Sequence, residues 1–340
     1  MRSALAKVGV LSHAERVMAT PQDRTPRPYQ IKYDLIRSPT PPRLIREAPM
    51  HDHLTLETGA RLDFFVKGDG DALLIYHHGT PAAGSIPLEI SVPAAAHGMV
   101  VAGLARPGYG GSTREPGRSV ADVVPLAAAL ADHLGHERFV TVGWSSGGPH
   151  AVACAALLPD RCMGAMSLAG NAPFDADGFD PLAGMDEIGI AEFSAAANDP
   201  AALEAIISQA AAEQRVVTSA QLLEMAPTLL PPADQAHLTA EIAEAIAEQI
   251  RWSLSDGFWG WFDDDIAVTR PWGFDLRSVR RPVLVWQGTA DGMVPIAHGQ
   301  WLAEHIPGAV THLVEGEGHL SIGGVACDPG FAELKRAVIT

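Results

Sequence analysis

Short apolar segments alternate with helical segments along most of the chain, and this alternation constrains the fold more than any other feature. The segments are mostly apolar, which indicates strands of a buried sheet. Parallel sheets whose strands are connected by helices show this pattern. The six segments are DALLIYHHG, MVVAGL, RFVTVGW, MGAMSLAG, RPVLVWQG and AVTHLVEG. We therefore predict an α/β protein with a mostly parallel central sheet and helices on both of its faces.

Residues 173–269 interrupt this alternation. They are rich in Ala and Glu at helical spacing, Asp199-Pro200 has the form of a helix start, and Thr218 with Gln221 matches a capping box. A helical insertion between two strands of a parallel sheet is most simply a cap over the carboxyl ends of the strands, where ligands bind. The predicted division is an α/β core over 51–172 and 270–340 and a helical cap over 173–269.

Residues 1–50 differ from the rest of the chain in charge and in proline content. They hold nine Lys and Arg against four Asp and Glu, together with seven of the 26 prolines. We predict a basic, proline-rich N-terminal extension that has no stable structure of its own. An arginine-rich transit peptide, or a translation start at Met50, is the alternative.

The overall composition excludes several classes of protein. The net charge is −16, which disfavours nucleic acid as a partner because such binding needs clustered Lys and Arg. No apolar run reaches the length of about 20 residues that a membrane helix requires. Cys154, Cys162 and Cys327 form neither an even set nor a CxxC motif, which favours free thiols in a reducing compartment. We expect a cytoplasmic protein that acts on a small molecule, and its oligomeric state stays open.

A serine stands between glycines directly after the apolar segment RFVTV. The stretch Gly143-Trp144-Ser145-Ser146-Gly147 matches G-x-S-x-G, the motif that places a nucleophilic serine at a sharp turn from strand to helix. The small residues on both sides let the strand and the helix approach each other closely. A glycine-rich surface turn is the simpler alternative. The position at the end of a strand favours Ser145 as a nucleophile.

A serine nucleophile needs a histidine base and an acid that orients this base. In this architecture the chain order is serine, acid, histidine. Asp291 follows the segment RPVLVWQG, and His319 follows AVTHLVEG. Because the carboxyl ends of parallel strands meet at one edge of a sheet, we expect Ser145, Asp291 and His319 to converge. Asp291 could instead only end a turn, in which case Asp175 is the alternative acid.

Two backbone N–H groups are expected to face the oxygen of the reacting carbonyl group. One should come from Ser146, directly after the nucleophile. The other should come from the loop that follows the segment DALLIY, where Thr80 is the candidate donor because Pro81 has no N–H. We expect one of His77 and His78 to pack or hydrogen-bond beneath this loop.

Together these motifs resemble the α/β-hydrolase superfamily, in a serine-nucleophile member with a helical cap. The resemblance covers about residues 51–340, and its motifs are HHGTP, ARPGYGGS, GWSSGG, GTADGMVP and EGEGHLS. Similar capped haloalkane dehalogenases and epoxide hydrolases place an aspartate where this chain has Ser145, so the resemblance disfavours those activities. It implies an esterase, a haloperoxidase-like enzyme, a proline iminopeptidase-like enzyme or a carbon–carbon bond hydrolase. The peptidase group is expected to carry HGGPG where this chain reads HGTPA, which favours ester hydrolysis.

The predicted function is that of a serine hydrolase acting on an ester or related acyl bond of a small, fairly apolar substrate. The reaction would pass through an acyl-enzyme intermediate and would use no cofactor and no metal. An aminopeptidase, a lactonase or a carbon–carbon bond hydrolase could use the same residues. A ligand-binding receptor with a slow or silent triad is the alternative outside catalysis.

Two side-chain clusters end the predicted cap. The aromatic cluster could form the core of the cap or line the substrate pocket, and its members are Trp252, Phe258, Trp259, Trp261 and Phe262. Asp263-Asp264-Asp265 follows directly. We expect this acidic run to be a solvated face and not a cation site.

Overall fold

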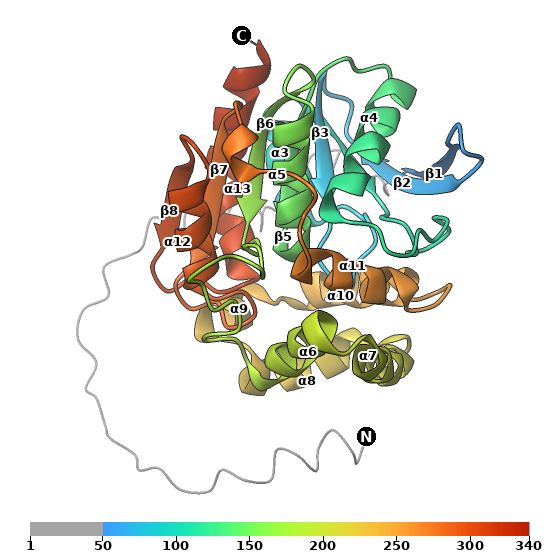
Figure 1. Ribbon diagram of the computed structural model, residues 1–340, viewed down its shortest axis with the longest axis vertical. Helices are drawn as coiled ribbons and strands as arrows, with labels where there is room; N and C mark the ends of the chain where they lie inside the picture. Colours follow the sequence, from blue (N-terminus) through green and yellow to red (C-terminus); the bar gives the residue numbers. More distant parts are fainter. Residues whose placement is uncertain (1–49, 340) are drawn as a thin grey trace, which may run out of the picture. The chain divides into compact units, whose positions relative to one another are not determined.

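An eight-stranded sheet forms the centre of the protein (Figure 1). The computed structural model describes residues 50–339. The strands are β1 (Met50–Thr55), β2 (Arg61–Lys67), β3 (Ala72–His77), β4 (Met99–Leu104), β5 (Phe139–Trp144), β6 (Cys162–Leu168), β7 (Val283–Gly288) and β8 (Val310–Val314). Their order across the sheet is β1-β2-β4-β3-β5-β6-β7-β8. All six predicted apolar segments are strands of this sheet.

The sheet is mostly parallel, as predicted. The six strands from β3 to β8 pair in parallel, whereas β1 pairs with β2, and β2 with β4, in antiparallel fashion. Every residue of β4, β5, β6 and β7 is buried. This burial on both faces explains why these segments are mostly apolar. The edge strand β8 has no buried residue.

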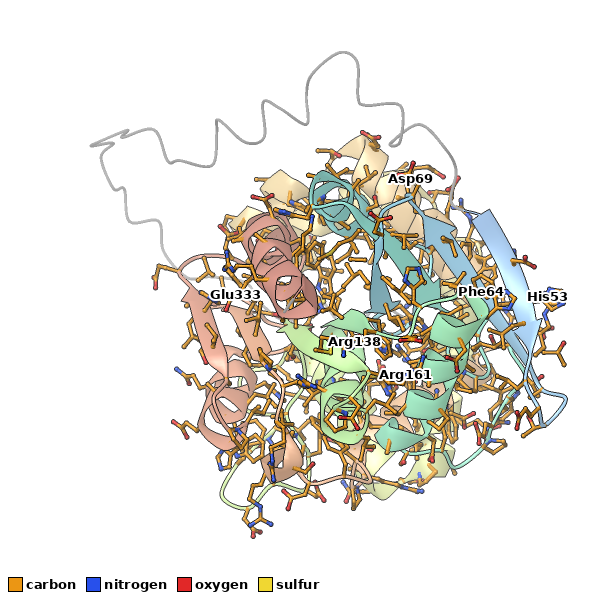
Figure 2. The ribbon with its side chains drawn as sticks, turned by 90° about the horizontal axis from the view of Figure 1, so that it is seen from above. His53, Phe64, Asp69, Arg138, Arg161 and Glu333 are labelled. Carbon is orange, nitrogen blue, oxygen red and sulfur yellow. The ribbon has the colours of Figure 1, made fainter. Side chains whose placement is uncertain are left out.

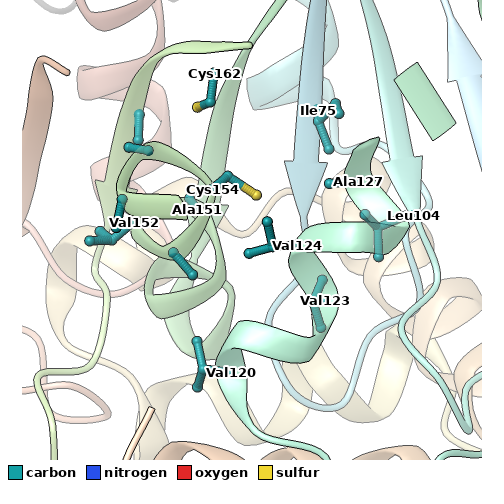
Figure 3. Packing of buried hydrophobic residues seen from close by; sticks show 14 of the residues in the cluster. Ile75, Leu104, Val120, Val123, Val124, Ala127, Ala151, Val152, Cys154 and Cys162 are labelled. Atoms are coloured by element: carbon teal, nitrogen blue, oxygen red, sulfur yellow. The ribbon is translucent and has the colours of Figure 1, made fainter. Parts of the chain in front are cut away.

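Helices cover both faces of the sheet. Leu73 and Ile75 of β3 belong to one buried cluster and Leu74 to another, because neighbouring residues of a strand point to opposite faces. The first cluster contains residues of α4 (Val124–His133), α5 (Gly148–Leu157) and α12 (Ile296–His305), and the second contains residues of α3 (Leu88–Ala96) and α13 (Ser321–Ile339). Figure 3 shows the first cluster, in which Val124 lies near Cys154 of α5.

Six α-helices lie between β6 and β7 in the chain, all within the predicted range 173–269. They are α6 (Glu187–Asn198), α7 (Pro200–Gln214), α8 (Ser219–Leu229), α9 (Pro232–His237), α10 (Ala240–Ser253) and α11 (Trp259–Thr269). Asp199 caps α7 and Thr218 forms a capping box with Gln221, both as predicted. Figure 1 shows these helices below the sheet. We call residues 187–269 the helical insertion.

The amino ends of the parallel strands lie away from the helical insertion. Figure 2 views the molecule from above, with Arg138 and Arg161 labelled. These two residues directly precede β5 and β6. Arg161 pairs there with Asp132 of α4 at 2.7 Å. The helical insertion therefore belongs to the carboxyl ends of the strands, where the predicted site residues follow β3, β5, β7 and β8.

The predicted N-terminal extension lies outside the described residues, apart from Met50 at the start of β1. Within residues 50–339, no helix is long and apolar enough to cross a membrane. The same range contains no group of three or more His, Cys, Asp or Glu side chains placed to hold a metal ion. Cys154, Cys162 and Cys327 are buried free thiols.

Candidate active site

Ser145 lies at the turn that joins β5 to α5. Its backbone φ is +57°, in the left-handed region that residues other than glycine seldom adopt. A Cβ atom at Gly143 would lie 2.0 Å from the carbonyl oxygen of Gly147, and one at Gly147 would lie 2.1 Å from the carbonyl oxygen of His77. Both positions therefore require glycine. The close packing of strand and helix holds Ser145 in its strained conformation, as the motif predicts.

Asp291 and His319 are in direct contact beyond the carboxyl ends of β7 and β8. Asp291 Oδ2 accepts a hydrogen bond from His319 Nδ1 at 2.8 Å. The same carboxylate accepts hydrogen bonds from Gln287 Nε2 at 3.0 Å and from the backbone N–H groups of Met293 and Val294 at 2.9 Å each. Four donors thus fix the carboxylate, and Asp291 in turn fixes the orientation of the imidazole ring.

The surroundings of His319 favour its protonated form. Burial alone lowers the pKa of His319, but the nearby carboxylates of Asp291, Asp234 and Asp186 outweigh it and raise the pKa above its ordinary value of 6.5. Because Asp291 binds Nδ1, the other ring nitrogen, Nε2, is the one that can accept a proton. The pair can therefore act as a general base whose charged form is stabilised.

The serine turn is joined directly to the histidine loop. Trp144, the residue before Ser145, donates a hydrogen bond from Nε1 to the carbonyl oxygen of His319 at 3.0 Å. Ser145 and His319 line the same pocket. Within residues 50–339, no hydrogen bond joins the Ser145 hydroxyl to the His319 ring, a contact that in many enzymes forms only when substrate binds. The acid alternative Asp175 is exposed, whereas Asp291 holds the histidine.

The loop after β3 packs against the serine turn. A Cβ atom at Gly79 would lie 3.2 Å from Cβ of Ser145, so the backbone of this loop approaches the serine closely. Thr80 and Ser146 line the pocket beside Ser145. His78 is buried beneath the loop, as expected, with Nδ1 donating to the carbonyl oxygen of Gly79 at 2.7 Å and Nε2 accepting from the N–H of Arg106 at 3.2 Å.

The expectation of a solvated face at Asp263–Asp265 is wrong, because all three side chains are buried. Asp264 pairs with Arg106 and with Arg118 at 2.5 Å each, and it accepts a hydrogen bond from Thr80 Oγ1 at 3.1 Å. Burial by itself raises the pKa of Asp264, but the two guanidinium groups hold it well below its ordinary value. Asp263 and Asp264 point inward because arginines from other segments meet them there, whereas Asp265 lies beside Glu192.

A pocket of about 470 Å³ contains the predicted site residues. Its sheet side is formed by Ser145, Ser146, Thr80 and His319. The helical insertion contributes apolar side chains, which include Ile188 of α6, Leu229 of α8, Ile246 of α10 and Trp261 of α11. From the aromatic cluster Trp261 lines the pocket, whereas Trp252 packs on Phe65 of β2 with the ring centroids 4.9 Å apart.

Two carboxyl groups, those of Glu192 and Asp265, lie together in the pocket wall. Trp261 Nε1 donates a hydrogen bond to Glu192 Oε1 at 2.7 Å. Burial raises the pKa of Asp265 well above its ordinary value, and the neighbouring Glu192 raises it further. Burial also raises the pKa of Glu192. Two like charges this close disfavour the ionisation of both carboxyl groups together.

Several residues of the site carry no signal in the sequence. Four residues that contact the site or line its pocket are Trp144, Arg106, Asp234 and Glu192. None of them belongs to a spacing pattern that marks its role. Arg106 does fall within the motif ARPGYGGS, but the motif does not indicate that its partner is Asp264. These contacts join segments that are far apart in the chain.

Comparison with known proteins adds a family and a relative in sequence. A family model described as alpha/beta hydrolase fold matches residues 72–323. A Bacillus subtilis (strain 168) protein described as an uncharacterized hydrolase, YcgS, is 26% identical over 278 residues. The match covers 80% of this chain and 93% of the relative. The relative is thus similar over nearly its whole length.

Solved structures share the fold at low sequence identity. A thermophilic esterase from Thermogutta terrifontis matches with a TM-score of 0.60 and 22% identity, covering 86% of this chain and 100% of that chain. A bromoperoxidase from Bacillus anthracis matches with a TM-score of 0.59 and 19% identity, covering 85% of this chain and 98% of that chain. At these identities the likeness concerns the fold alone.

Proposed function

The chain belongs to the alpha/beta hydrolase fold family, and we propose that it is a serine hydrolase. Its substrate is an ester or related acyl compound that is small and fairly apolar. Ser145 is the nucleophile, His319 the general base and acid, and Asp291 the group that orients the histidine. One observation carries the proposal. Asp291 contacts the ring of His319 at 2.8 Å, and His319 lines the same pocket as the strained Ser145.

The reaction proceeds in two halves. His319 Nε2 takes the hydroxyl proton of Ser145 while Oγ attacks the carbonyl carbon, and the backbone N–H groups of Thr80 and Ser146 donate hydrogen bonds to the resulting oxyanion. The carbon–oxygen bond to the alcohol then breaks, and His319 returns the proton to the departing alcohol. Water attacks the acyl-enzyme with the same histidine as base, which releases the carboxylic acid and restores Ser145.

The helical insertion sets what can reach the serine. We propose that residues 173–269 act as a cap, since α6, α8, α10 and α11 contribute to the pocket that contains Ser145. A pocket of about 470 Å³ is in the range that suits a small molecule. Its apolar lining supports a substrate with an apolar acyl or alcohol group. The proposed chemistry uses only the chain's own side chains and backbone.

The proposal is tested by ester turnover and by active-site labelling. The wild-type protein should hydrolyse a p-nitrophenyl ester and react with a fluorophosphonate probe, and Ser145→Ala should lose both activities. Ser219→Ala is the matched control, because this hydroxyl belongs to α8 and bonds Glu244 at 2.6 Å. Full labelling of Ser145→Ala would contradict the assignment of the nucleophile. A wild-type protein that binds apolar esters without reacting would instead be a ligand-binding module.

The pair Glu192 and Asp265 favours a second candidate, the cleavage of substrates that carry a free amine. A protonated amine entering the pocket would meet these two neighbouring carboxyl groups, which are its natural ionic partners. An aminopeptidase-like activity would then use the same triad. The test compares aminoacyl p-nitroanilides with their N-acetylated forms. A preference for the free amine that disappears in Glu192→Gln supports this candidate, and equal rates for both forms exclude it.

A further inference from the structure

Asp234, on the short helix α9 of the helical insertion, contacts the loop that carries His319. It is fully buried. Its carboxylate accepts hydrogen bonds from the backbone N–H groups of His319 at 2.9 Å, Leu320 at 3.0 Å and Ser321 at 2.8 Å. Ser321 is the first residue of α13. A side chain from the helical insertion thus satisfies the free N–H groups at the start of a helix of the core.

The loop leaves no space between itself and this carboxylate. A Cβ atom at Gly318 would lie 2.5 Å from the carboxyl carbon and from both oxygens of Asp234. The position therefore requires glycine, and any side chain there would displace the carboxylate. The N–H of Gly318 donates instead to Ser321 Oγ at 2.9 Å. The turn is closed on one side by Ser321 and on the other by Asp234.

The backbone of His319 is held on both sides. Its N–H binds Asp234 at 2.9 Å, and its carbonyl oxygen accepts the hydrogen bond from Trp144 at 3.0 Å. The ring is held separately, by Asp291. Each of these partners comes from a different part of the chain. Of the three, Asp234 alone belongs to the helical insertion.

Helix α9 is itself tied to the core at its other end. His237, the last residue of α9, forms a 2.7 Å contact with Glu89 of α3 through Nε2 and Oε1. Both side chains are at most one-tenth exposed. Because α9 is fixed at both ends, Asp234 can hold the loop of His319 in a defined position.

Asp234 also adds negative charge beside His319. The carboxylates that raise the pKa of His319 come from the loop after β7 (Asp291), from α9 (Asp234) and from the start of α6 (Asp186). The other titratable groups in the wall of the same pocket are Tyr76, Glu89, Glu192, His237 and Asp265. Removing the charge of Asp234 should therefore lower the pKa of the histidine.

We propose that Asp234 is a positioning residue of the hydrolase, which holds the His319 backbone so that the ring bridges Asp291 and Ser145. This inference rests on the proposed function. It connects the helical insertion to the catalytic base, so that the segment that admits the substrate also supports the reaction. Asp234 itself touches neither the substrate nor the reacting atoms.

The variant Asp234→Asn tests the inference, because it keeps the shape of the side chain and removes its charge. We expect kcat for a p-nitrophenyl ester to fall about 10- to 100-fold, with KM changed less than about twofold. The acid limb of the pH profile of kcat/KM should shift to lower pH, because a histidine with a lower pKa stays neutral further into acid. Asp199→Asn is the matched control: Asp199 is an exposed helix cap, and its variant should keep the wild-type kcat and pH profile.

A folded Asp234→Asn protein with wild-type kcat and an unshifted acid limb would overturn the inference. If this variant does not fold, Gly318→Ala is measured instead, since a Cβ there displaces the carboxylate while its charge stays. A wild-type kcat in Gly318→Ala overturns the inference, and a tenfold or larger loss supports it.

Two further readouts separate this inference from the proposed function. An NMR titration of the His319 ring needs no substrate and should give a lower pKa in Asp234→Asn than in the wild type. Fluorophosphonate labelling of the wild type tests the proposed function. If the wild type does not react, the proposed function is wrong. If the wild type reacts and Asp234→Asn reacts equally fast, only the role of Asp234 is wrong.

Discussion

The central sheet and the helical insertion are stabilised in different ways. In the sheet, four strands are buried over their whole length between two layers of helices. In the insertion, many of the buried apolar residues are alanines. Of the ten large apolar side chains exposed within residues 50–339, six belong to the insertion: Ile188, Ile190, Val216, Leu223, Met225 and Leu229. The sheet is an extensive apolar core, and the insertion is a thinner layer.

Besides apolar contacts such as that of Trp252 with Phe65, the insertion contacts the core through buried polar groups. Asp264 of α11 binds Arg106 and Arg118, and Asp234 of α9 binds the loop of His319. Such contacts are directional, so they define position more sharply than apolar packing does. We expect the loops at the sheet edge to supply the reacting groups. The insertion is expected to control the access of substrate to Ser145 and the position of His319.

The largest expected effect tests the sheet edge. Asp291→Asn should lower kcat for a p-nitrophenyl ester by about 10³- to 10⁴-fold, because an amide can favour the wrong tautomer of His319. The melting temperature should change little. The exposed Asp275→Asn serves as control, since within residues 50–339 this carboxylate bonds only Arg277, two positions further along the chain. A wild-type kcat in Asp291→Asn would show that the acid lies elsewhere.

The next effect tests the polar contact between the two regions. Asp264→Ala leaves Arg106 and Arg118 buried without their partner, and we expect a loss of about 3–5 kcal/mol in the free energy of unfolding. Asp263 pairs with the partly exposed Arg114 at 2.8 Å, so Asp263→Ala should cost less than about 1 kcal/mol. Urea denaturation measures both. Equal losses in the two variants would contradict the larger contribution to stability expected of the Asp264 ion pairs.

A third pair of variants compares apolar packing in the two regions. Leu74 of β3 is fully buried, and Leu74→Ala should destabilise the protein by about 2–5 kcal/mol. Leu229 of α8 is 51% exposed, and Leu229→Ala should change the free energy of unfolding by less than about 0.5 kcal/mol. A large loss in Leu229→Ala would contradict the view of the insertion as a thin layer.

The smallest effect is a pH dependence that both regions share. The histidine must be neutral to accept the proton of Ser145, so kcat/KM should fall as the pH drops through the raised pKa of His319, with a midpoint above 6.5. Asp186→Asn should move this midpoint to lower pH by less than Asp234→Asn does, because Asp186 is exposed and is the weakest of the three contributors. A pH–rate profile of each variant provides the measurement. A midpoint that stays in place in both variants would show that neither Asp186 nor Asp234 affects the titration of His319.

The predicted features that the structure reproduces are those with a local cause. The apolar segments predict six strands because burial on both faces leaves a continuous apolar run. The capping box at Thr218 and Gln221 is likewise formed as predicted. Asp291 and His319 meet beyond the ends of neighbouring parallel strands, and their catalytic roles stay a prediction. In each case, residues close in sequence carry the information.

The features that the sequence did not predict are contacts of buried polar groups. Three consecutive aspartates usually indicate a solvated surface, and the positions of Arg106 and Arg118 give no local sign that they will meet Asp264. Asp234 is similarly inconspicuous, because its hydrogen bonds reach residues 85 to 87 positions further along the chain. Its neighbours in sequence do not reveal these partners.

The amino-acid sequence by itself determined the strands, the class of fold and the order of the three candidate catalytic residues, because periodicity and turn chemistry act over a few residues. Only the tertiary structure decided which buried charges meet and how the helical insertion contacts the histidine loop. The physical reason is that a buried charge is stable only beside a partner, and packing, not proximity in the chain, selects that partner.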